Sequence, residues 1–384
     1  MTSRPRSKVT WGGARRLGRD ERGMTYVFVA CGFMAFLGAS MLAIDVGMLM
    51  TARNQAQNSA DAGALAGATA LVYNDWDDRT PTGPAVTNAL NASRANEVMA
   101  GTVSVNASDV EFLTDPAGVN NRVRVSVYRT SARGNPLSTI IARYFGMAEA
   151  GVGAVATAEA SPSNAMTCVK PFTIPDRWTE KGTAPFDPTD SFDPGDVYIG
   201  PEDKENYTGY NAEDDKGTEI VLKASNDTKI APSFYYPWDM EGQNRGADDY
   251  RWSIGNCKTD VMGFGDTFVA EPGAMVGPTK QGMGDLIARD PDAYWDDIHK
   301  EVVSSMKPSP RVVAIPLFDP QYYYEGKMNG RNASLKFVNY LGFFIKEMRG
   351  NEVVGVVSPI GGLRVGNGGP APEGAFPKTI RLVQ

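Results

Sequence analysis

The hydrophobic pattern of this chain begins with one long apolar stretch near the N-terminus. Residues 24–44 are 21 consecutive amino acids without a formal charge. As a helix that rises about 1.5 Å per residue, this stretch would cover roughly 30 Å, the thickness of one bilayer hydrocarbon core. From Val46 to Val72 the chain continues without proline and is dense in alanine. The pattern therefore predicts a membrane-spanning helix that continues for several turns beyond the membrane surface.

The residues that precede this stretch predict its orientation. Seven basic side chains lie ahead of it against two acidic ones, and an excess of Lys and Arg beside a first span normally stays in the cytoplasm. We therefore expect a cytoplasmic N-terminus and an exported body. Two alternatives remain open here, a buried core helix and a cleaved signal peptide, although a signal peptide usually has a shorter apolar region followed by a small-residue cleavage site.

Shorter periodic segments follow the long helix and predict a compact α+β unit. Pro84–Met99 has helical character, and residues 103–113 predict one or two strands. In residues 122–127 three valines alternate with polar side chains, which is the period of a strand with one buried face. Apolar residues in the segment 137–145 recur at helical spacing, and residues 152–158 predict a returning strand. The expected order is helix, strands, helix, strand.

The pattern changes near residues 161–165, after which proline, aspartate and aromatic residues become frequent. Residues 176–250 show little periodicity and predict long surface loops. A short helix is expected over residues 284–289 or 292–301. Apolar runs predict three further strands, the last two joined by the turn RGNE: Arg311–Phe318, Leu335–Ile345 and Val353–Val357.

Together these patterns predict an α+β fold. It consists of a long N-terminal transmembrane helix that extends into a small α+β module, of the general pilin-like kind, and a β-rich C-terminal domain. About 310 residues follow the long helix, which is enough for one large or two ordinary domains. The expected segments are a basic cytoplasmic tail (1–22), a transmembrane helix (23–50), its continuation with the α+β periplasmic module (51–164) and a β-rich periplasmic domain (165–384).

Charge and cysteine content support export and narrow the range of partners. The net charge is −7, and because residues 1–50 contain seven basic and three acidic side chains, the other 334 residues carry −11. An acidic body argues against nucleic acid as a partner, since phosphate binding needs clustered Lys and Arg. Cys31 lies within the predicted span. Cys168 and Cys257 lie in the exported part, where they are expected to form a disulfide; two separate buried thiols are the alternative.

Three strings near the N-terminus carry a resemblance to a known family. The basic RRLGRDERG before the span, AIDVG at its end and TARNQAQNSADAGALAGATAL after it resemble the N-terminal segment of TadE/TadG-like Flp (tight adherence) pilus-assembly proteins of bacteria. The similarity covers roughly residues 16–73. Weaker strings, among them CVKPFTIPDRW and SPRVVAIPLFDP, are similar to the C-terminal part of some TadG-related proteins.

The resemblance implies a single-pass protein of the bacterial inner membrane with its body in the periplasm. Its role would be assembly or anchoring of the pilus apparatus, without enzymatic activity or a cofactor. The implied partners are other Tad pilus-assembly proteins or pilins and membrane lipid, with a second copy of this chain as a further candidate.

Two features depart from the family pattern. Members that the prepilin peptidase cleaves usually carry glutamate at the fifth position after the cleavage-site glycine. After Gly23 and Met24, the candidate processing site, that position is Phe28, so cleavage and helix packing through a carboxylate both lose support. Longer TadG proteins also contain a von Willebrand factor A domain with an Asp-x-Ser-x-Ser motif. The nearest string, from Asp187 to Ser191, lacks the first serine, so the resemblance is to a short form without that domain.

Four residues of the long helix are candidates for helix packing or partner recognition. Asp45 follows the apolar run, and an ionisable group at membrane depth is costly unless it reaches water or a partner. A position already in the headgroup region is the alternative for Asp45. Ser59, Gly63 and Gly67 form a line of small side chains that lets another backbone approach closely. The alternative is that this line packs on the chain's own module.

Sites for metals and catalysis have little support in the sequence. One histidine, His299, and two well-separated exported cysteines lack the ligand spacing of zinc sites or a catalytic triad. Four aspartates recur at every third position: Asp187, Asp190, Asp193 and Asp196. They form either an ordinary acidic surface loop, which is the simpler interpretation, or a calcium-binding loop.

The leading hypothesis is a membrane-anchored, periplasm-facing structural or assembly component of the Flp pilus system, with a minor pilin as its more specific form. The alternative is a membrane-tethered extracytoplasmic binding or adhesion protein that works outside pilus assembly. A periplasmic hydrolase would need an active-site constellation that the sequence does not offer.

Overall fold

The structure is a computed structural model. It describes residues 21–182, 187, 189–225, 229–240, 246–271, 273–306, 308–326, 334–366 and 369–383. Most of the expected cytoplasmic tail, residues 1–20, lies outside the described residues. Those that are described divide into two compact units, one with residues 21–54 and 129–152, the other with residues 55–128 and 153–383.

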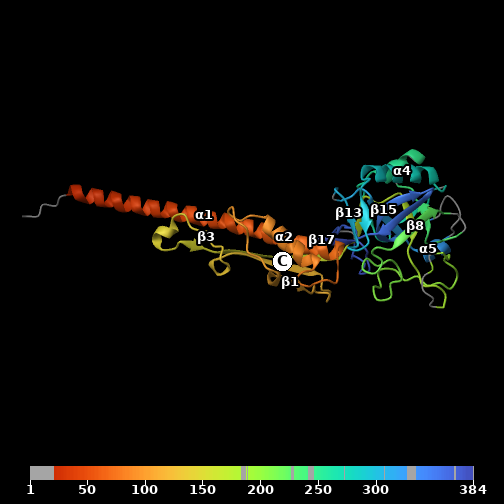
Figure 1. Cartoon of the computed structure of the whole chain (residues 1–384), viewed down its shortest axis with the longest axis horizontal. Coiled ribbons are helices and arrows are strands. Elements are labelled where there is room, and N and C mark those ends of the chain that lie inside the picture. Colours follow the sequence, from red (N-terminus) through yellow and green to blue (C-terminus); the bar gives the residue numbers. More distant parts are fainter. Residues whose placement is uncertain are drawn as a thin grey trace, which may run out of the picture. The chain divides into compact units, whose positions relative to one another are not determined.

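The helix α1 (Glu21–Tyr73) is unbroken over 53 residues and contains both the predicted span and its predicted continuation (Figure 1). At 1.5 Å per residue it is about 80 Å long. Within the described chain it is the one helix long and apolar enough to cross a membrane, and its most apolar window is not buried anywhere. The predicted long N-terminal helix is confirmed.

The first unit pairs the N-terminal part of α1 with a small hairpin. Strands β3 (Leu137–Ser138) and β4 (Glu149–Ala150) are antiparallel, and the 3-10 turn η3 (Ala142–Phe145) lies between them; η2 (Ser131–Arg133) precedes them. The helix predicted over residues 137–145 is therefore wrong. The spacing of its apolar residues suits a helix, but Ile140, Tyr144 and Phe145 are exposed, so no core holds them on one helical face.

The second unit begins with the rest of α1 and an antiparallel sheet of order β1-β2-β5-β17. The valines of β2 at positions 123, 125 and 127 are buried, as their alternation predicts. Residues 103–105 do not form a regular strand and contribute an isolated pairing of Ser104 with Tyr128. The predicted helix and strands are otherwise observed, with these bounds: α2 Pro84–Ala95, η1 Ala107–Asp109, β1 Val110–Leu113, β2 Arg122–Arg129 and β5 Val152–Pro162.

Six strands of the described C-terminal part close into a barrel. Their order around it is β15-β14-β7-β9-β8-β16, and β16 pairs again with β15. The β14–β7 and β8–β9 pairs are parallel, and the other pairs are antiparallel. The bounds are β7 Phe172–Pro175, β8 Glu219–Ala224, β9 Phe234–Pro237, β14 Val312–Phe318, β15 Ser334–Arg349 and β16 Glu352–Val357.

Alternation along the barrel strands places one set of apolar side chains inside. Val313, Ile315 and Leu317 of β14 belong to one core cluster, which takes members from all six strands. Gly355 of β16 leaves room for the Phe343 ring, because a Cβ at position 355 would lie 2.3 Å from the ring atom Cζ. The three strands predicted from apolar runs are thus confirmed, and they form about half of the barrel wall.

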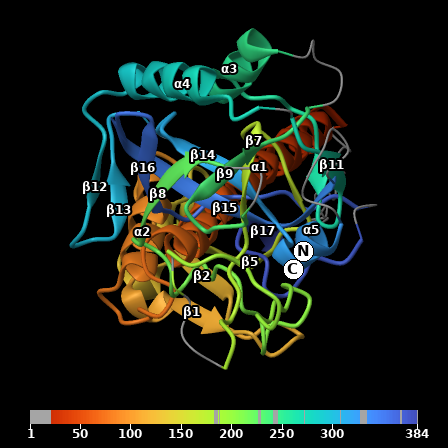
Figure 2. The same cartoon turned by 90° about the vertical axis from the view of Figure 1, so that its right-hand side faces the viewer.

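Two helices and several short elements complete the barrel domain. The helices α3 and α4 lie side by side over the barrel and contribute Ile254 and Met283 to its core (Figure 2). The predicted helix at residues 284–289 is the end of α4. Residues 294–303 form a hairpin instead of the alternative helix at 292–301, and the Asp296 carboxylate accepts the backbone N–H groups of Ile298 and His299 in its turn. The remaining bounds are α3 Ala247–Gly255, α4 Val276–Arg289, α5 Pro320–Glu325, β6 Ala165–Met166, β10 Met262–Gly263, β11 Thr267–Val269, β12 Tyr294–Asp296 and β13 Glu301–Val303.

The last strand returns to the first sheet. β17 (Lys378–Val383) pairs antiparallel with β5, from Lys378 opposite Pro162 to Val383 opposite Thr157. The barrel is therefore an insertion between two neighbouring strands of the small sheet, and the chain enters and leaves it on adjacent strands. The pairing of β17 with β5 was not predicted from the sequence pattern. The predicted domain boundaries stay a prediction.

Candidate functional site

The N-terminal part of α1 exposes its apolar side chains on every face. Tyr26 is 79% exposed, Phe28 72% and Met34 76%. A Cβ added at Gly32 or Gly38 would meet no atom within 4 Å. The candidate processing site, Gly23 and Met24, lies in the first turn of this exposed segment. A helix that is apolar all round needs an apolar environment, which a bilayer or a bundle of similar helices supplies.

Asp45 lies just beyond these residues and is 5% exposed. One of its carboxylate oxygens accepts the backbone N–H of Ile140 at 2.7 Å. The other accepts the N–H of Ile141 at 3.0 Å and that of Ala142 at 2.6 Å. These contacts cap the start of η3, where backbone N–H groups would otherwise have no partner. The carboxylate therefore ties the hairpin of the first unit to the helix.

The line of small side chains is buried within the second unit. The Ser59 hydroxyl donates to the backbone oxygen of Ser93 in α2 at 2.8 Å. A Cβ on Gly63 would lie 2.0 Å from Ser93 Oγ, and a Cβ on Gly67 would lie 2.8 Å from Val123 Cγ1 of β2. Glycine is needed at both positions because α2 and β2 approach the helix backbone so closely.

This burial determines whether the small-residue face of α1 can contact a partner protein. Five alanines on the same side of α1 are fully buried: Ala52, Ala56, Ala60, Ala64 and Ala68. In the structure, Ser59, Gly63 and Gly67 pack on the chain's own α2 and β2, which was the alternative to partner packing. A second protein helix cannot reach this face while the module is folded.

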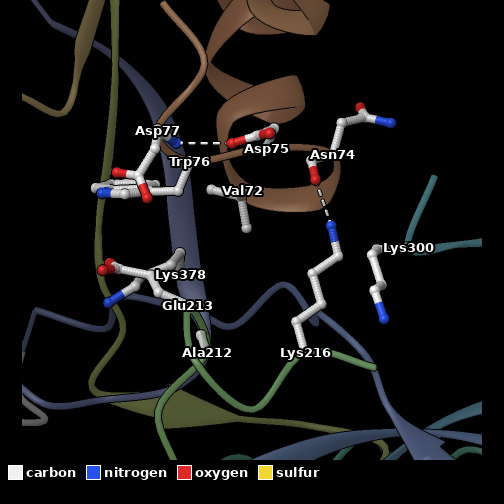
Figure 3. Close-up of a pocket in the computed structure, with 10 residues that line it drawn as sticks. All are labelled: Val72, Asn74, Asp75, Trp76, Asp77, Ala212, Glu213, Lys216, Lys300 and Lys378. Carbon is white, nitrogen blue, oxygen red and sulfur yellow. Dashed lines mark hydrogen bonds between the residues drawn. The ribbon is translucent and has the colours of Figure 1, made fainter. Parts of the chain in front are cut away.

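The C-terminal end of α1 meets the barrel domain at a cavity of about 270 Å³ (Figure 3). Lys216 donates from Nζ to the backbone oxygen of Tyr73 at 2.8 Å and also to that of Asn74. A cation at the C-terminus of a helix is favourable because the last carbonyl groups lack partners in the helix. Two further lysines line the cavity, Lys300 and Lys378, and burial lowers the pKa of Lys378 to about 8.

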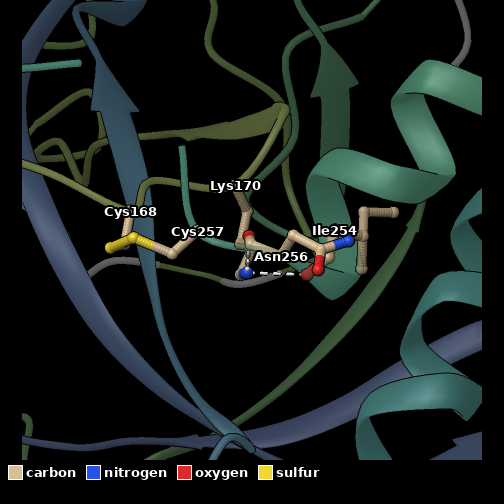
Figure 4. The surroundings of a disulfide bond; sticks show 5 residues. All are labelled: Cys168, Lys170, Ile254, Asn256 and Cys257. Atoms are coloured by element: carbon tan, nitrogen blue, oxygen red, sulfur yellow. Dashed lines mark hydrogen bonds between the residues drawn. A yellow bond between two sulfur atoms is a disulfide. The ribbon is translucent and has the colours of Figure 1, made fainter. Parts of the chain in front are cut away.

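A disulfide joins Cys168 and Cys257 in the barrel domain. Figure 4 shows Lys170 beside it, with its ammonium group directed at the end of α3. Lys170 Nζ donates to the backbone oxygens of Ile254 at 2.6 Å and Asn256 at 3.2 Å. Burial, with a smaller contribution from nearby Arg289, lowers the pKa of Lys170 to about 8. The arrangement stabilises a helix end and closes a loop of the barrel.

The acidic loop uses its carboxylates to hold turns. Asp187 accepts the backbone N–H and the hydroxyl of Thr189, and Asp196 accepts the backbone N–H groups of Lys181 and Asp193. Within the described residues no group of three or more His, Cys, Asp or Glu side chains is arranged to hold a metal ion. His299 pairs with Asp296 through Nδ1 at 2.7 Å on the surface.

Two contacts of α1, those of Asp45 and of Lys216, could not be predicted from the sequence. The backbone N–H groups of residues 140–142 lie about 95 positions after Asp45 in the chain, and they were predicted to be in a helix. Lys216 lies in a region predicted to be loops, and nothing in its neighbours signals that it caps α1. Both contacts depend on tertiary folding, which brings distant backbone groups together.

Comparison with known proteins gives a finding for the same residues of α1. No curated protein and no solved structure matches the chain. A family model does match, and its range, residues 23–70, covers the apolar part of α1, Asp45 and the small-residue line. The resemblance of the N-terminal segment is thereby confirmed, since this segment is similar to the family described as "Putative Flp pilus-assembly TadE/G-like".

Proposed function

We propose that this protein is a single-pass, membrane-anchored structural component of Flp pilus assembly whose body lies on the periplasmic side of the inner membrane. The association with Flp pilus assembly comes from the match of residues 23–70. The anchor is inferred from the exposed apolar side chains of α1, and the location of the body from the excess of basic residues ahead of them. The partners would be other Tad pilus-assembly proteins or pilins.

The observation that carries the proposal is the change of environment along one unbroken helix. Residues 24–44 expose apolar side chains, whereas α1 beyond residue 52 packs its small side chains on α2 and β2. A helix of this kind joins a membrane segment directly to a folded body, because no loop interrupts α1 between them. Lys216 and the β5–β17 pair then connect the barrel domain to the same helix and sheet.

We further propose that the chain acts with its N-terminal segment intact. Phe28 occupies the position where cleaved family members carry glutamate, and it is 72% exposed within the apolar segment. Phe28 cannot supply the carboxylate on which processing and filament packing depend. This favours stationary assembly machinery over a minor pilin. The structural contacts above support a role in positioning, and the family association favours a structural role over catalysis.

The test is the mass of the N-terminal peptide of the native protein, taken from membranes and from material sheared off the cells. A peptide that begins at Met1 or Thr2 and is found in membranes supports a permanent anchor. A chain that begins at Met24 in sheared filaments would contradict it and identify a minor pilin. Copurification with pilus components from the same membranes separates pilus assembly from an unrelated tethered adhesion protein.

A further inference from the structure

We propose that the tip of the β3–β4 hairpin, residues 139–147, is a second membrane contact that inserts its side chains into the outer interface of the lipid bilayer. This inference rests on the proposed function, because it requires residues 24–44 of α1 to span that bilayer. It adds an interaction surface that is separate in sequence from the span.

The tip carries more exposed apolar surface than a loop in water normally does. Ile140 is 48% exposed, Tyr144 73%, Phe145 68% and Met147 60%. These four large apolar side chains lie within eight residues of one hairpin tip, and clusters of exposed apolar side chains mark sites of contact with proteins or membranes. The same tip buries Thr139, whose hydroxyl donates to the backbone oxygen of Met147 at 2.5 Å. The tip is thus a hydrogen-bonded turn whose large apolar side chains are exposed.

Asp45 holds the tip at the end of the apolar part of α1. Its carboxylate accepts three consecutive N–H groups at the start of η3, and the residue before it, Ile44, is the last of the uncharged run. Figure 1 shows β3 and the following turn alongside α1 within this unit. Leu42 and Ile44 are themselves 67% and 49% exposed. Because Asp45 follows them in α1 and binds the backbone of residues 140–142, the exposed apolar side chains of the tip are held at the end of the apolar part of the helix.

The chemistry of the tip fits the interfacial region of a bilayer. Tyr144 has an apolar ring and a polar hydroxyl, and tyrosine is enriched at the depth of lipid headgroups. The guanidinium of Arg143 lies 5.0 Å from the centre of the Tyr144 ring and donates to its hydroxyl at 3.1 Å. A basic group next to exposed aromatic side chains suits anionic headgroups above an acyl-chain boundary. A protein partner for the same patch is an outcome that the test below separates.

Fluorescent labels at three depths test the proposal in the full chain, reconstituted into vesicles of equal parts phosphatidylethanolamine and phosphatidylglycerol. The first label is placed on native Cys31, within the span. The second is placed on Phe145→Cys and the third on Ala132→Cys, each in a Cys31→Ser background. Ala132 is an exposed residue of the same unit outside the tip. Lipids with a nitroxide near the headgroup or near the acyl-chain end then quench each label according to its depth.

We expect the label at position 145 to be quenched most by the shallow nitroxide, the label on Cys31 to be quenched most by the deep one, and the label at position 132 to remain unquenched. Quenching at Cys31 without quenching at 145 would overturn the interfacial contact and leave the anchor intact. A label at 145 that is unquenched in vesicles but protected in assemblies isolated from cells would assign the patch to a protein partner. Absence of quenching at Cys31 would instead contradict the proposed function itself.

Discussion

The two parts of α1 share one helical backbone but have opposite surroundings. In residues 24–44 large apolar side chains are exposed on every face, and glycines 32 and 38 have open space around them. Beyond residue 52 the buried side chains are alanine, serine and glycine, together with Leu71 near the end of the helix. The first part is suited to lipid and the second to close contact with protein.

The comparison shows that glycine is required by its surroundings in one part of α1 and not in the other. In the buried part a glycine is required by the close approach of α2 and β2. In the exposed part no neighbouring atom requires one, and glycine lowers helix stability relative to alanine. Asp45 stands between the two parts as the first acidic side chain after the span.

Replacing glycine by leucine should show the contrast most strongly. Gly63→Leu forces a side chain into Ser93 Oγ and Val125 Cγ1, which would lie 2.0 Å and 3.2 Å from its Cβ. We expect the free energy of unfolding of the body to fall by about 3 kcal/mol or more, since overpacking a core strains its neighbours. The matched control Gly38→Leu meets no neighbouring atom and should leave it unchanged. Thermal unfolding in detergent measures both, and equal effects would contradict the assignment of the two parts.

A change of pH should alter the stability of the body but not the membrane binding of residues 24–44, which carry no acidic or basic side chain. Burial raises the pKa of the Asp176 carboxyl to about 6, although hydrogen bonds from the Tyr207 and Tyr198 hydroxyls and from the backbone N–H groups of Tyr210 and Arg177 lower it. An unfolded aspartate has a pKa of about 3.9. The folded state therefore binds the proton more tightly, so this stabilising contribution is present below about pH 4 and lost as the pH rises through about 6.

The size of this effect follows from the difference between the two pKa values. Between about pH 4 and pH 6 the free energy of unfolding of the native protein should fall by up to about 3 kcal/mol relative to Asp176→Asn. Urea unfolding at several pH values measures that difference. A difference that is flat across this range would mean that Asp176 has an ordinary pKa in the folded barrel. Membrane partition of the protein should not change over the same range.

Removing the carboxylate at the boundary between the two parts should release the hairpin without unfolding the body. In Asp45→Ala, three backbone N–H groups of residues 140–142 lose their acceptor. The local opening free energy should fall by about 1–3 kcal/mol, the range for a lost charged hydrogen-bond partner. Hydrogen exchange of these amides measures it. Asp61→Ala is the matched control, because the Asp61 carboxylate accepts from Gln57 in the same helix, and comparable exchange in both variants would contradict the role of Asp45.

The predictability of these regions differs for a physical reason. The span, the buried valines of β2 and the apolar strands of the barrel follow from periodicity, because each pattern reports which face of a local element is buried. The position of Asp45 at the end of the apolar run marks it as unusual, but the apolar spacing of residues 137–145 predicts a helix and does not show that their backbone N–H groups bind Asp45. The return of β17 to β5 was equally hidden, because strand pairing over some 220 residues leaves no local signal. Local burial can be predicted from the sequence, whereas distant hydrogen bonds of the backbone cannot.

The far end of α1 gives the smallest and most specific test of how the helix is connected to the barrel. In Lys216→Met the carbonyl groups of Tyr73 and Asn74 lose a charged donor. The free energy of unfolding should fall by about 1–2 kcal/mol, because both the hydrogen bonds and the favourable charge at the helix end are lost. Lys223→Met removes an exposed ion pair with Glu352 in the barrel and should cost less, since exposed pairs contribute little. If urea unfolding finds the two variants equal, Lys216 does not couple the anchor helix to the barrel. If only Lys216→Met also speeds hydrogen exchange in the last turn of α1, the contact joins the two domains as the structure indicates.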